Sequence, residues 1–222
     1  MTNPKQIVGE KATEFIENGM TVGLGTGSTA YFTTRKVGQL IQNGLNIRCV
    51  PTSKSTEQLA YKWNIPLVPI SEVEKIDITI DGADEVDPDK NLIKGGGGAH
   101  LREKIVASIT GYYIIIVDNS KLVHHLGKFK LPVEITPFAR EVTRRQVNQL
   151  GCTSDWRKKE DGSDFISDND NFILDCSFEL IKDPRALNLT LNQIPGVVEN
   201  GLFVGMADKI ISSDSEGNLK IY

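Results

Sequence analysis

The chain has 222 residues, of which 39% are hydrophobic, and a formal net charge of −4, so it can bury a core and is not a generally basic binder of nucleic acid or anionic membranes. Its longest apolar run, residues 112–117, is far shorter than the ~20 residues that span a bilayer. Three cysteines without metal or redox spacing, and an N-terminus without an apolar signal region, predict a reduced cytoplasmic protein that begins at its mature start.

In the first half of the chain, short apolar runs alternate with helical patterns. Strands are predicted at residues 21–24, 47–50, 76–80 and 112–117. Helices are predicted at residues 4–19, 30–41, 53–63 and 99–109. Because strands that alternate with helices on short connections form parallel sheets covered on both faces, this half predicts a Rossmann-like parallel-sheet domain.

After Gly127 the pattern changes. Strands are predicted at residues 131–135, 152–156, 172–176 and 197–203, and helices at residues 138–150 and 183–194. Their order, β-α-β-β-α-β, is that of a ferredoxin-like unit. The last two segments, 207–211 and 219–222, are predicted as a strand pair that rejoins the first sheet. The predicted fold is therefore α/β, with a Rossmann-like catalytic domain (1–128 and 204–222) and an inserted smaller ferredoxin-like α+β domain (129–203).

Ligands of an open parallel sheet bind at the carboxyl ends of its strands, and four loops are expected there. The first, residues 25–29 (the first glycine loop), reads Gly-Thr-Gly-Ser-Thr between a strand and a helix. Its glycines, amides and hydroxyls favour a phosphate at the helix N-terminus, and the alternative is a tight turn capped by Ser28. A dinucleotide site is disfavoured because Ser28 replaces the third glycine and residues 49–52 lack the ribose-binding acid.

Acidic residues follow the predicted strand at 76–80. Asp81 and Asp84 can hydrogen-bond sugar hydroxyls, bind a metal or transfer protons, and the alternative is a solvated acidic turn. A calcium loop is excluded because its required glutamate would fall on Leu92. The fourth loop adds Lys121, which can pair with a phosphate or a loop acid, or lie exposed as an ordinary surface lysine.

Four consecutive glycines follow Lys94 in the third loop, residues 94–98 (the second glycine loop). A glycine run is entropically costly in an ordered fold, so a close approach of its backbone to another group is expected. Glu103 lies early in the helix that follows. The predicted apolar face of that helix consists of Leu101, Ile105 and Ile109. Glu103 is then about 200° from Leu101 and faces a cleft or bulk water, and its alternative role is that of a favourable partner of the helix dipole.

At these loops the sequence resembles ribose-5-phosphate isomerase of the A type (phosphoriboisomerase). The matching segments are residues 25–30, 81–85, 94–97, 102–105, 120–121, 126–129, 131–134 and 194–198. Each motif alone is weak, but their joint order and spacing are specific, and together they cover essentially the whole chain. Two residues depart from the family pattern: Gly98 is an additional glycine, and His100 stands where the family usually has a small residue.

The resemblance implies interconversion of D-ribose 5-phosphate and D-ribulose 5-phosphate in the non-oxidative branch of the pentose phosphate pathway, without metal or cofactor. It implies that Glu103 is the proton acceptor, that the partner is a small-molecule phosphosugar, and that the protein is a homodimer or homotetramer. The implied substrate-binding residues are Thr26, Gly27, Ser28, Thr29, Asp81, Gly82, Ala83, Asp84, Lys94, Gly95, Gly96, Gly97 and Lys121.

The residue chemistry agrees with this implied reaction, which moves a proton between neighbouring carbons through an enediol(ate). Glu103 can serve as the base, and Lys94 with nearby backbone amides can stabilise the developing oxyanion. Asp81 is assigned to ring opening and Asp84 to holding Lys94 or a hydroxyl, and these two assignments can be exchanged. A phosphate bound at residues 28–29 would position the reacting carbons.

Two other functions compete with the isomerase. A sugar-phosphate-sensing module on the same fold would keep the first glycine loop and need no base, but Glu103, Lys94 and Asp81 occur together and no DNA-binding segment is apparent. An enzyme that transfers acyl groups or CoA would use a glutamate as nucleophile, and the short chain and hydroxyl-rich first glycine loop disfavour it. The histidines His100, His124 and His125 have no ligand-like spacing, so no metal site is expected.

Overall fold

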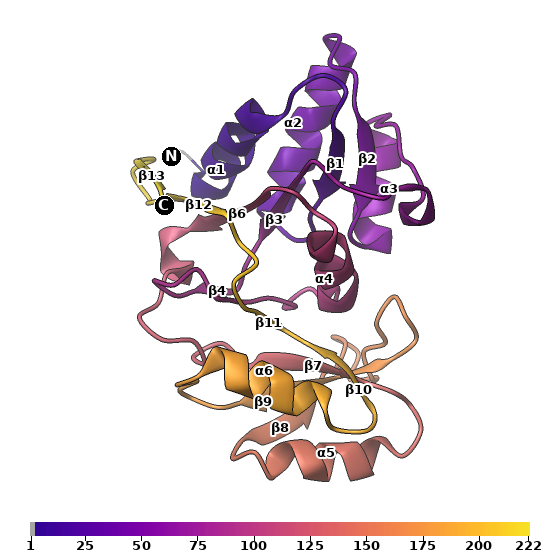
Figure 1. Cartoon of the computed structure of the whole chain (residues 1–222), viewed down its shortest axis with the longest axis vertical. Coiled ribbons are helices and arrows are strands. Elements are labelled where there is room, and N and C mark those ends of the chain that lie inside the picture. Colours follow the sequence, from indigo (N-terminus) through magenta and orange to yellow (C-terminus); the bar gives the residue numbers. More distant parts are fainter. Residues whose placement is uncertain (1–2) are drawn as a thin grey trace. The chain divides into compact units, whose positions relative to one another are not determined.

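The computed structural model describes residues 3–222, so Met1 and Thr2, where the predicted mature start lies, fall outside it. These residues form two compact units (Figure 1): unit 1 comprises 3–83, 102–122 and 206–222, and unit 2 comprises 84–101 and 123–205. The units differ from the predicted domain limits, because 84–101, 123–128 and 204–205 belong to unit 2. The functional division into a catalytic and a ferredoxin-like domain stays a prediction. Within 3–222, no helix combines the length and apolarity needed to cross a membrane.

Unit 1 is built on a six-stranded sheet of order β13-β12-β6-β3-β1-β2. Its strands are β1 (Thr21–Leu24), β2 (Arg48–Pro51), β3 (Ile78–Gly82), β6 (Tyr113–Asp118), β12 (Lys209–Ser213) and β13 (Leu219–Ile221). Neighbouring strands are parallel except for β13, which runs antiparallel at one edge. The prediction of a mainly parallel sheet completed by the C-terminal strands is therefore confirmed.

The strands of unit 1 are apolar because helices cover them. The helices are α1 (Pro4–Ala12), α2 (Ala30–Gln42), α3 (Lys54–Lys62) and α4 (His100–Ser108), with short 3₁₀ turns η1 (Thr13–Phe15), η2 (Ile70–Glu72) and η3 (Asn119–Lys121). Ser53 caps α3 as predicted, since its hydroxyl accepts a hydrogen bond from the Thr56 amide at 3.0 Å. Side chains of these helices and strands, among them Val8, Leu24 and Val37, form the buried core.

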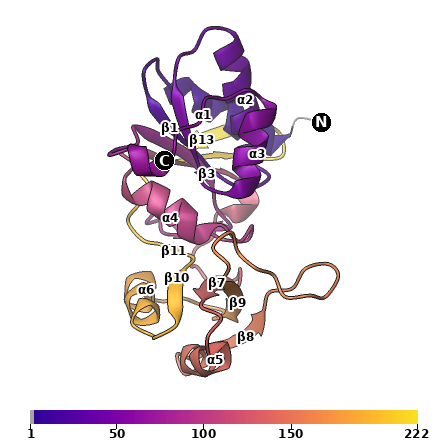
Figure 2. The same ribbon diagram turned by 90° about the vertical axis from the view of Figure 1, so that its right-hand side faces the viewer.

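Unit 2 contains a four-stranded antiparallel sheet of order β10-β7-β9-β8. Its elements are β7 (Leu131–Ile135), α5 (Arg140–Asn148), β8 (Thr153–Trp156), β9 (Phe172–Ser177), α6 (Pro184–Asn192) and β10 (Val197–Asn200). The helices α5 and α6 lie beside this sheet (Figure 2). The chain order confirms the predicted β-α-β-β-α-β unit, and Asp183 caps α6 by accepting from the Ala186 amide at 2.9 Å.

A third sheet was not expected from the sequence. It joins β11 (Leu202–Phe203), β5 (Leu92–Ile93) and β4 (Glu85–Val86) within unit 2. The predicted single strand at 197–203 is therefore wrong. The strand breaks at Gly201. The Gly201 amide donates a hydrogen bond to the Pro132 carbonyl, and the Gly201 carbonyl accepts one from the Lys94 amide at 2.9 Å. A Cβ on Gly201 would lie 2.3 Å from the Lys94 carbonyl oxygen, so only glycine permits this crossing.

This sheet also corrects the expected location of the second glycine loop. Residues 94–98 follow β5, a two-residue strand of the third sheet, rather than a strand of the parallel sheet. The other three candidate loops do follow parallel strands: 25–29 follows β1, 83–87 follows β3 and 119–121 follows β6. The glycine run has no periodicity of its own, so its assignment rested on its neighbours.

Candidate active site

The first glycine loop joins β1 to α2, and its serine does not cap the helix. Thr29 is the N-cap residue of α2 and makes no side-chain capping bond. The Ser28 hydroxyl instead accepts a hydrogen bond from the Lys5 ammonium at 2.9 Å. The alternative of a turn capped by Ser28 is therefore wrong. An ammonium, a hydroxyl and a helix N-terminus together present the groups that bind a phosphate.

Lys5 was missed by the sequence analysis because it lies 23 residues from its partner, near the start of α1. Lys5 also lines a pocket of about 430 Å³. That pocket is lined by Asn3, Pro4, Lys5, Asp118, Asn119, Ser120, Ser213, Asp214 and Ser215. Lys121, the predicted substrate-binding lysine, is half-buried and ends the adjacent η3 turn. A lysine early in a helix carries no local signal of such a role.

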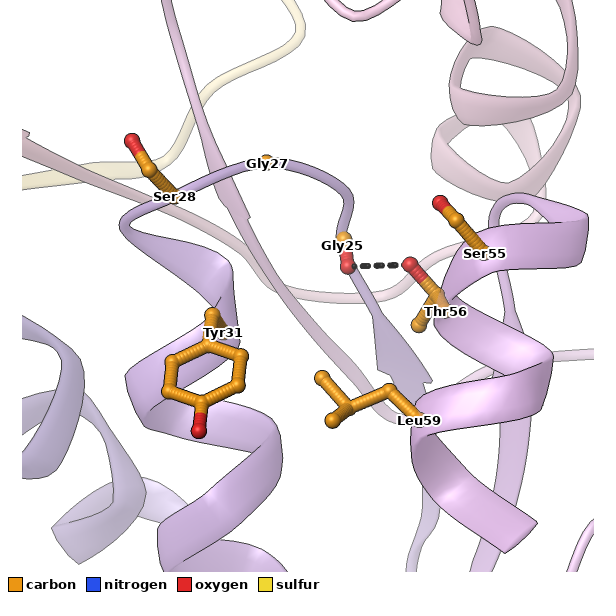
Figure 3. Close-up of a pocket in the computed structure, with 7 residues that line it drawn as sticks. All are labelled: Gly25, Gly27, Ser28, Tyr31, Ser55, Thr56 and Leu59. Carbon is orange, nitrogen blue, oxygen red and sulfur yellow. Dashed lines mark hydrogen bonds between the residues drawn. The ribbon is translucent and has the colours of Figure 1, made fainter. Parts of the chain in front are cut away.

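Thr26 is held inward by a cluster of hydroxyls. Its hydroxyl lies 2.7 Å from that of Thr52 and 2.8 Å from that of Ser53, at the junction of β2 and α3. The Thr56 hydroxyl donates to the Gly25 carbonyl at 3.0 Å (Figure 3). These bonds fix the loop without any charged side chain. A pocket of about 400 Å³ beside it is lined by Gly25, Gly27, Ser28, Tyr31, Ser55, Thr56 and Leu59.

Asp81 lies at the end of β3 and is fully buried. Its Oδ1 atom accepts from the amides of Thr26 at 3.0 Å and Gly82 at 2.7 Å. A Cβ on Gly25 would lie 2.2 Å from that oxygen, so glycine is required where the first glycine loop passes the carboxylate. The solvated acidic turn that was the alternative for Asp81 is wrong, because the side chain is a buried anchor of the loop.

Tyr113 on β6 interacts with the carboxylates of both Asp81 and Glu103. Its hydroxyl donates to Oδ2 of Asp81 at 3.3 Å. Burial, followed by the negative charges of Asp81 and Glu103, raises the pKa of Tyr113 well above its ordinary value, so the phenol stays protonated. A buried tyrosine hydroxyl generally needs a partner. That general rule is the only signal in the sequence that could have singled this residue out.

Glu103 is buried, with 4% of its surface exposed, on the inner face of α4. The predicted apolar face of this helix is wrong, because Ile105 is 48% exposed. The buried face consists instead of His100, Glu103, Val106 and Ala107. The helix is therefore rotated relative to the apolar pattern. A carboxylate in the first turn that merely served the helix dipole would not need to be buried.

In unit 2, Lys94 and Asp84 lie at the edges of the third sheet. Lys94 is 2% exposed, and its ammonium lies 5.4 Å from the centre of the Phe203 ring. Asp84 is half-buried, and its Oδ2 atom accepts from the Gly96 amide at 2.7 Å. The Asp84 amide donates to the Ile93 carbonyl at 2.8 Å. The aspartate thereby links β5 to the second glycine loop.

The glycines of the second glycine loop have distinct surroundings. Gly95 has φ +105°, and a Cβ there would lie 2.8 Å from Nδ1 of His100. Gly98 has φ +79°, and a Cβ would lie 2.5 Å from the Phe165 ring. Both are buried, whereas Gly96 and Gly97 between them are exposed. The expected close approaches of the backbone are thus confirmed at both ends of the loop, and Gly97 at its tip is exposed to solvent.

The model of one family, ribose 5-phosphate isomerase A (phosphoriboisomerase A), matches residues 48–217. The chain belongs to this family. It is 51% identical to ribose-5-phosphate isomerase A of Bacillus mycoides over 98% of each chain. It is 46% identical to the Listeria monocytogenes enzyme of the same name, over 100% of this chain and 99% of that one. The resemblance proposed from the sequence motifs is confirmed.

Solved structures agree with this assignment to the isomerase family. One is a D-ribose-5-phosphate isomerase in complex with phospho-erythronic acid, with TM-score 0.95 and 38% identity over 100% of this chain and 99% of that chain. Another is the ribose 5-phosphate isomerase of Plasmodium falciparum, with TM-score 0.95 and 39% identity over 98% and 97% of the two chains. The predicted α/β fold class is confirmed.

His100, which departs from the family pattern, is fully buried in unit 2. Its Nε2 atom lies 4.0 Å from Oε2 of Glu134, which is equally buried. The other oxygen of Glu134 accepts from Ser167, Asn169 and Asn171. His100 thus lies between the second glycine loop and a polar network on β7. These contacts indicate a structural role for the histidine.

Proposed function

We propose that the protein is an aldose–ketose isomerase that interconverts D-ribose 5-phosphate and D-ribulose 5-phosphate through an enediol(ate), in the non-oxidative pentose phosphate pathway. Membership of the ribose 5-phosphate isomerase A family supports this assignment. The observation that carries the mechanism is a buried carboxylate, Glu103, that acts on the same tyrosine as buried Asp81. Acid–base work in an isomerase needs such a shielded carboxylate.

Glu103 is the proposed base. It removes the proton from the carbon next to the carbonyl and returns it to the neighbouring carbon. A positioned base of this kind contributes about 10²–10⁴-fold to the rate. Burial excludes water from the carboxylate, which keeps the abstracted proton available for return.

Lys94 and the exposed Gly97 amide are assigned to the oxyanion that develops on the substrate. A cation and amide donors that are fixed before the reaction stabilise such a charge most strongly where water is excluded. Lys94 is held at its backbone by Gly201, and the Gly96 amide is held by Asp84. Both fixed positions support this role.

Asp81 and Asp84 share the opening of the sugar ring and the binding of its hydroxyls. Asp84 is half-buried and keeps surface on which a hydroxyl can dock, whereas Asp81 is fully buried. We therefore assign the first contact with the sugar to Asp84 and the positioning of the first glycine loop to Asp81. The sequence alone assigned ring opening to Asp81 and the holding of Lys94 or a hydroxyl to Asp84, and it left these two assignments exchangeable.

The phosphate of the substrate is assigned to the first glycine loop, with residues 26–29 and Lys5 as its site and Lys121 as a second cation. The N-terminus of α2 and the Lys5–Ser28 contact support this assignment. Gly82, Ala83 and Gly95 are proposed to line the sugar. A cytoplasmic location and assembly as a homodimer or homotetramer are proposed on the family resemblance.

The test is conversion of ribose 5-phosphate to ribulose 5-phosphate by the purified protein, with and without excess chelator. Turnover that ignores the chelator is expected. The Glu103→Gln variant should lose about 10²–10⁴-fold in kcat with little change in KM. Glu57→Gln is the matched control, since Glu57 is also an acid in the first turn of a helix, and it should leave kcat unchanged.

Two results would contradict the proposal. Binding of ribose 5-phosphate without turnover would favour the sugar-phosphate-sensing module. Near-normal kcat in Glu103→Gln, with turnover intact, would leave the reaction in place and remove Glu103 as its base.

A further inference from the structure

Arg157 lies directly after β8 and contacts both its own sheet and the second glycine loop. Its Nε and Nη2 atoms donate to the two carboxylate oxygens of Asp175 on β9, at 3.0 and 2.5 Å. Its Nη1 atom donates to the carbonyl oxygens of Gly95 at 2.7 Å and Gly96 at 3.2 Å. The Arg157 side chain is 12% exposed and the Asp175 side chain 20% exposed. One planar, forked group therefore joins a carboxylate to two consecutive loop carbonyls.

The backbone of Arg157 is itself held in place. Its amide donates to the Ile173 carbonyl at 2.9 Å, and its carbonyl accepts from the Phe165 amide at 2.9 Å. The Phe165 ring lies 5.8 Å from the guanidinium and would be 2.5 Å from a Cβ on Gly98. Arg157 is thus anchored on β9 and on the 158–171 hairpin, and this hairpin also packs against the end of the loop.

The peptide group between Gly95 and Gly96 is held at both of its polar atoms. Arg157 binds its carbonyl oxygen, which also accepts from the Gly98 amide at 2.9 Å, and Asp84 accepts from its amide at 2.7 Å. Because a peptide group is planar, partners on both of its polar atoms fix its rotational setting.

The next peptide group, between Gly96 and Gly97, is set by the same guanidinium. Arg157 binds its carbonyl oxygen at 3.2 Å. In a trans peptide the N–H points opposite to the C=O, so the Gly97 amide is directed away from Arg157. Gly97 is exposed. The guanidinium therefore fixes a donor that the loop offers outward.

We propose that Arg157, oriented by Asp175, is a positioning residue for the isomerisation, which sets the Gly97 amide as a donor to the oxyanion of the reacting sugar. This inference rests on the proposed role of the second glycine loop. Arg157 makes no contact with the substrate itself and acts through the loop. Loss of the guanidinium should let the Gly96–Gly97 peptide rotate, so the cost falls on the transition state rather than on binding of the phosphosugar.

The test compares Arg157→Gln, the double variant Arg157→Gln/Asp175→Asn and Arg157→Lys in the ribose 5-phosphate assay, with Tm measured for each. Arg157→Gln should lower kcat about 10–100-fold, as expected for a donor displaced by about 1 Å, while KM changes less than threefold. The double variant removes the carboxylate left without its partner. It should recover Tm towards wild type but not kcat. Arg157→Lys restores one donor and should recover part of kcat.

Arg140→Gln is the matched control. Arg140 pairs with Asp164 at 2.8 Å and stacks on Trp156 and Phe172 in the same unit, so its contacts are with the sheet and the 158–171 hairpin rather than with the second glycine loop. It should lower Tm without lowering kcat. If the double variant has wild-type kcat, or if kcat falls equally in Arg140→Gln, the proposal is overturned. Glu103→Gln measured alongside separates this failure from failure of the proposed function, since that variant must lose turnover whatever Arg157 does.

Discussion

The two glycine loops are held in fixed conformations by different kinds of side chain. The first glycine loop is fixed by short neutral hydroxyls, with Thr26 held by Thr52 and Ser53, and by one buried carboxylate, Asp81. The second glycine loop is fixed by long charged side chains, with Arg157 at its carbonyls and Asp84 at an amide. Glycines permit the close approach in both loops, but different side chains hold them there.

The difference follows from where each loop is attached. The first glycine loop leaves β1, an interior strand of a six-stranded sheet, where β2 and β3 on either side supply fixed neighbours within hydroxyl reach. The second leaves a two-residue strand of a small sheet, where few neighbours exist. Longer, charged side chains must then reach it from the end of β8, in the case of Arg157, and from the start of β4, in the case of Asp84. We expect the first loop to be sensitive to side-chain size and the second to the loss of charge.

The largest effect is expected for Gly25→Ala, which tests whether the first glycine loop is sensitive to side-chain size. Its Cβ would lie 2.2 Å from Oδ1 of Asp81, so the carboxylate or the loop must move by about 1 Å, and kcat should fall about 100-fold. The steady-state rate on ribose 5-phosphate gives this value. Gly44→Ala is the control, with φ +102° and no heavy atom within 4 Å of its Cβ. It should cost about 1–3 kcal/mol of stability and leave kcat unchanged. Equal losses of kcat in both variants would show that backbone strain, rather than the carboxylate contact, matters.

A smaller effect is expected for Lys5→Ala, which tests a long charged side chain on the first glycine loop. Removal of one charged hydrogen bond to the substrate phosphate, worth about 1.5–3 kcal/mol, should raise KM at least about tenfold and change kcat less. Lys11→Ala is the matched control, because Lys11 lies on the same helix and its ammonium pairs with Glu14. An unchanged KM in Lys5→Ala would limit Lys5 to tying α1 to the loop.

The smallest effect concerns the protonation of Tyr113. Its pKa is raised in the folded protein by burial and by Asp81 and Glu103, from an ordinary value of 10.0. Its contribution to the free energy of unfolding is therefore complete below pH 10 and is lost as the pH rises beyond it, because only the unfolded chain ionises readily. Tyr113→Phe should lower stability by about 1 kcal/mol at pH 8 and flatten the decline above pH 10. Urea unfolding at pH 8 and pH 11 measures both. A decline as steep as that of wild type would assign the alkaline loss to other groups.

Much of the fold could be predicted because long apolar runs determine it. The strands Thr21–Leu24 and Leu131–Ile135 agree with the prediction residue for residue, since each is a buried run between clear turns. The strands of the third sheet have two residues each and no detectable period, so they were missed. The apolar face of α4 was wrong for a different reason: the face that is buried carries the polar side chains His100 and Glu103, and an apolar pattern cannot indicate them.

Part of the candidate site could likewise be predicted from the sequence, and part could not. Its loops could be predicted from local composition, because glycines and carboxylates cluster there along the chain. Lys5, Tyr113 and Arg157 could not, since their partners lie 23, 32 and about 60 residues away. An ordinary lysine in a helix, a tyrosine in a strand and an arginine after a strand carry no local mark. Only the folded chain brings them to the loops.

The order of the strands in unit 1 has a consequence for synthesis of the chain. β6 is completed at Asp118, but its parallel neighbour β12 begins only at Lys209, after all of the 123–205 segment. A ribosome adding about 5–20 residues per second leaves that edge of the sheet unpaired for several seconds or more. An open strand edge is a template for aggregation. Nascent chains stalled before Lys209 should therefore be the species that most needs a chaperone.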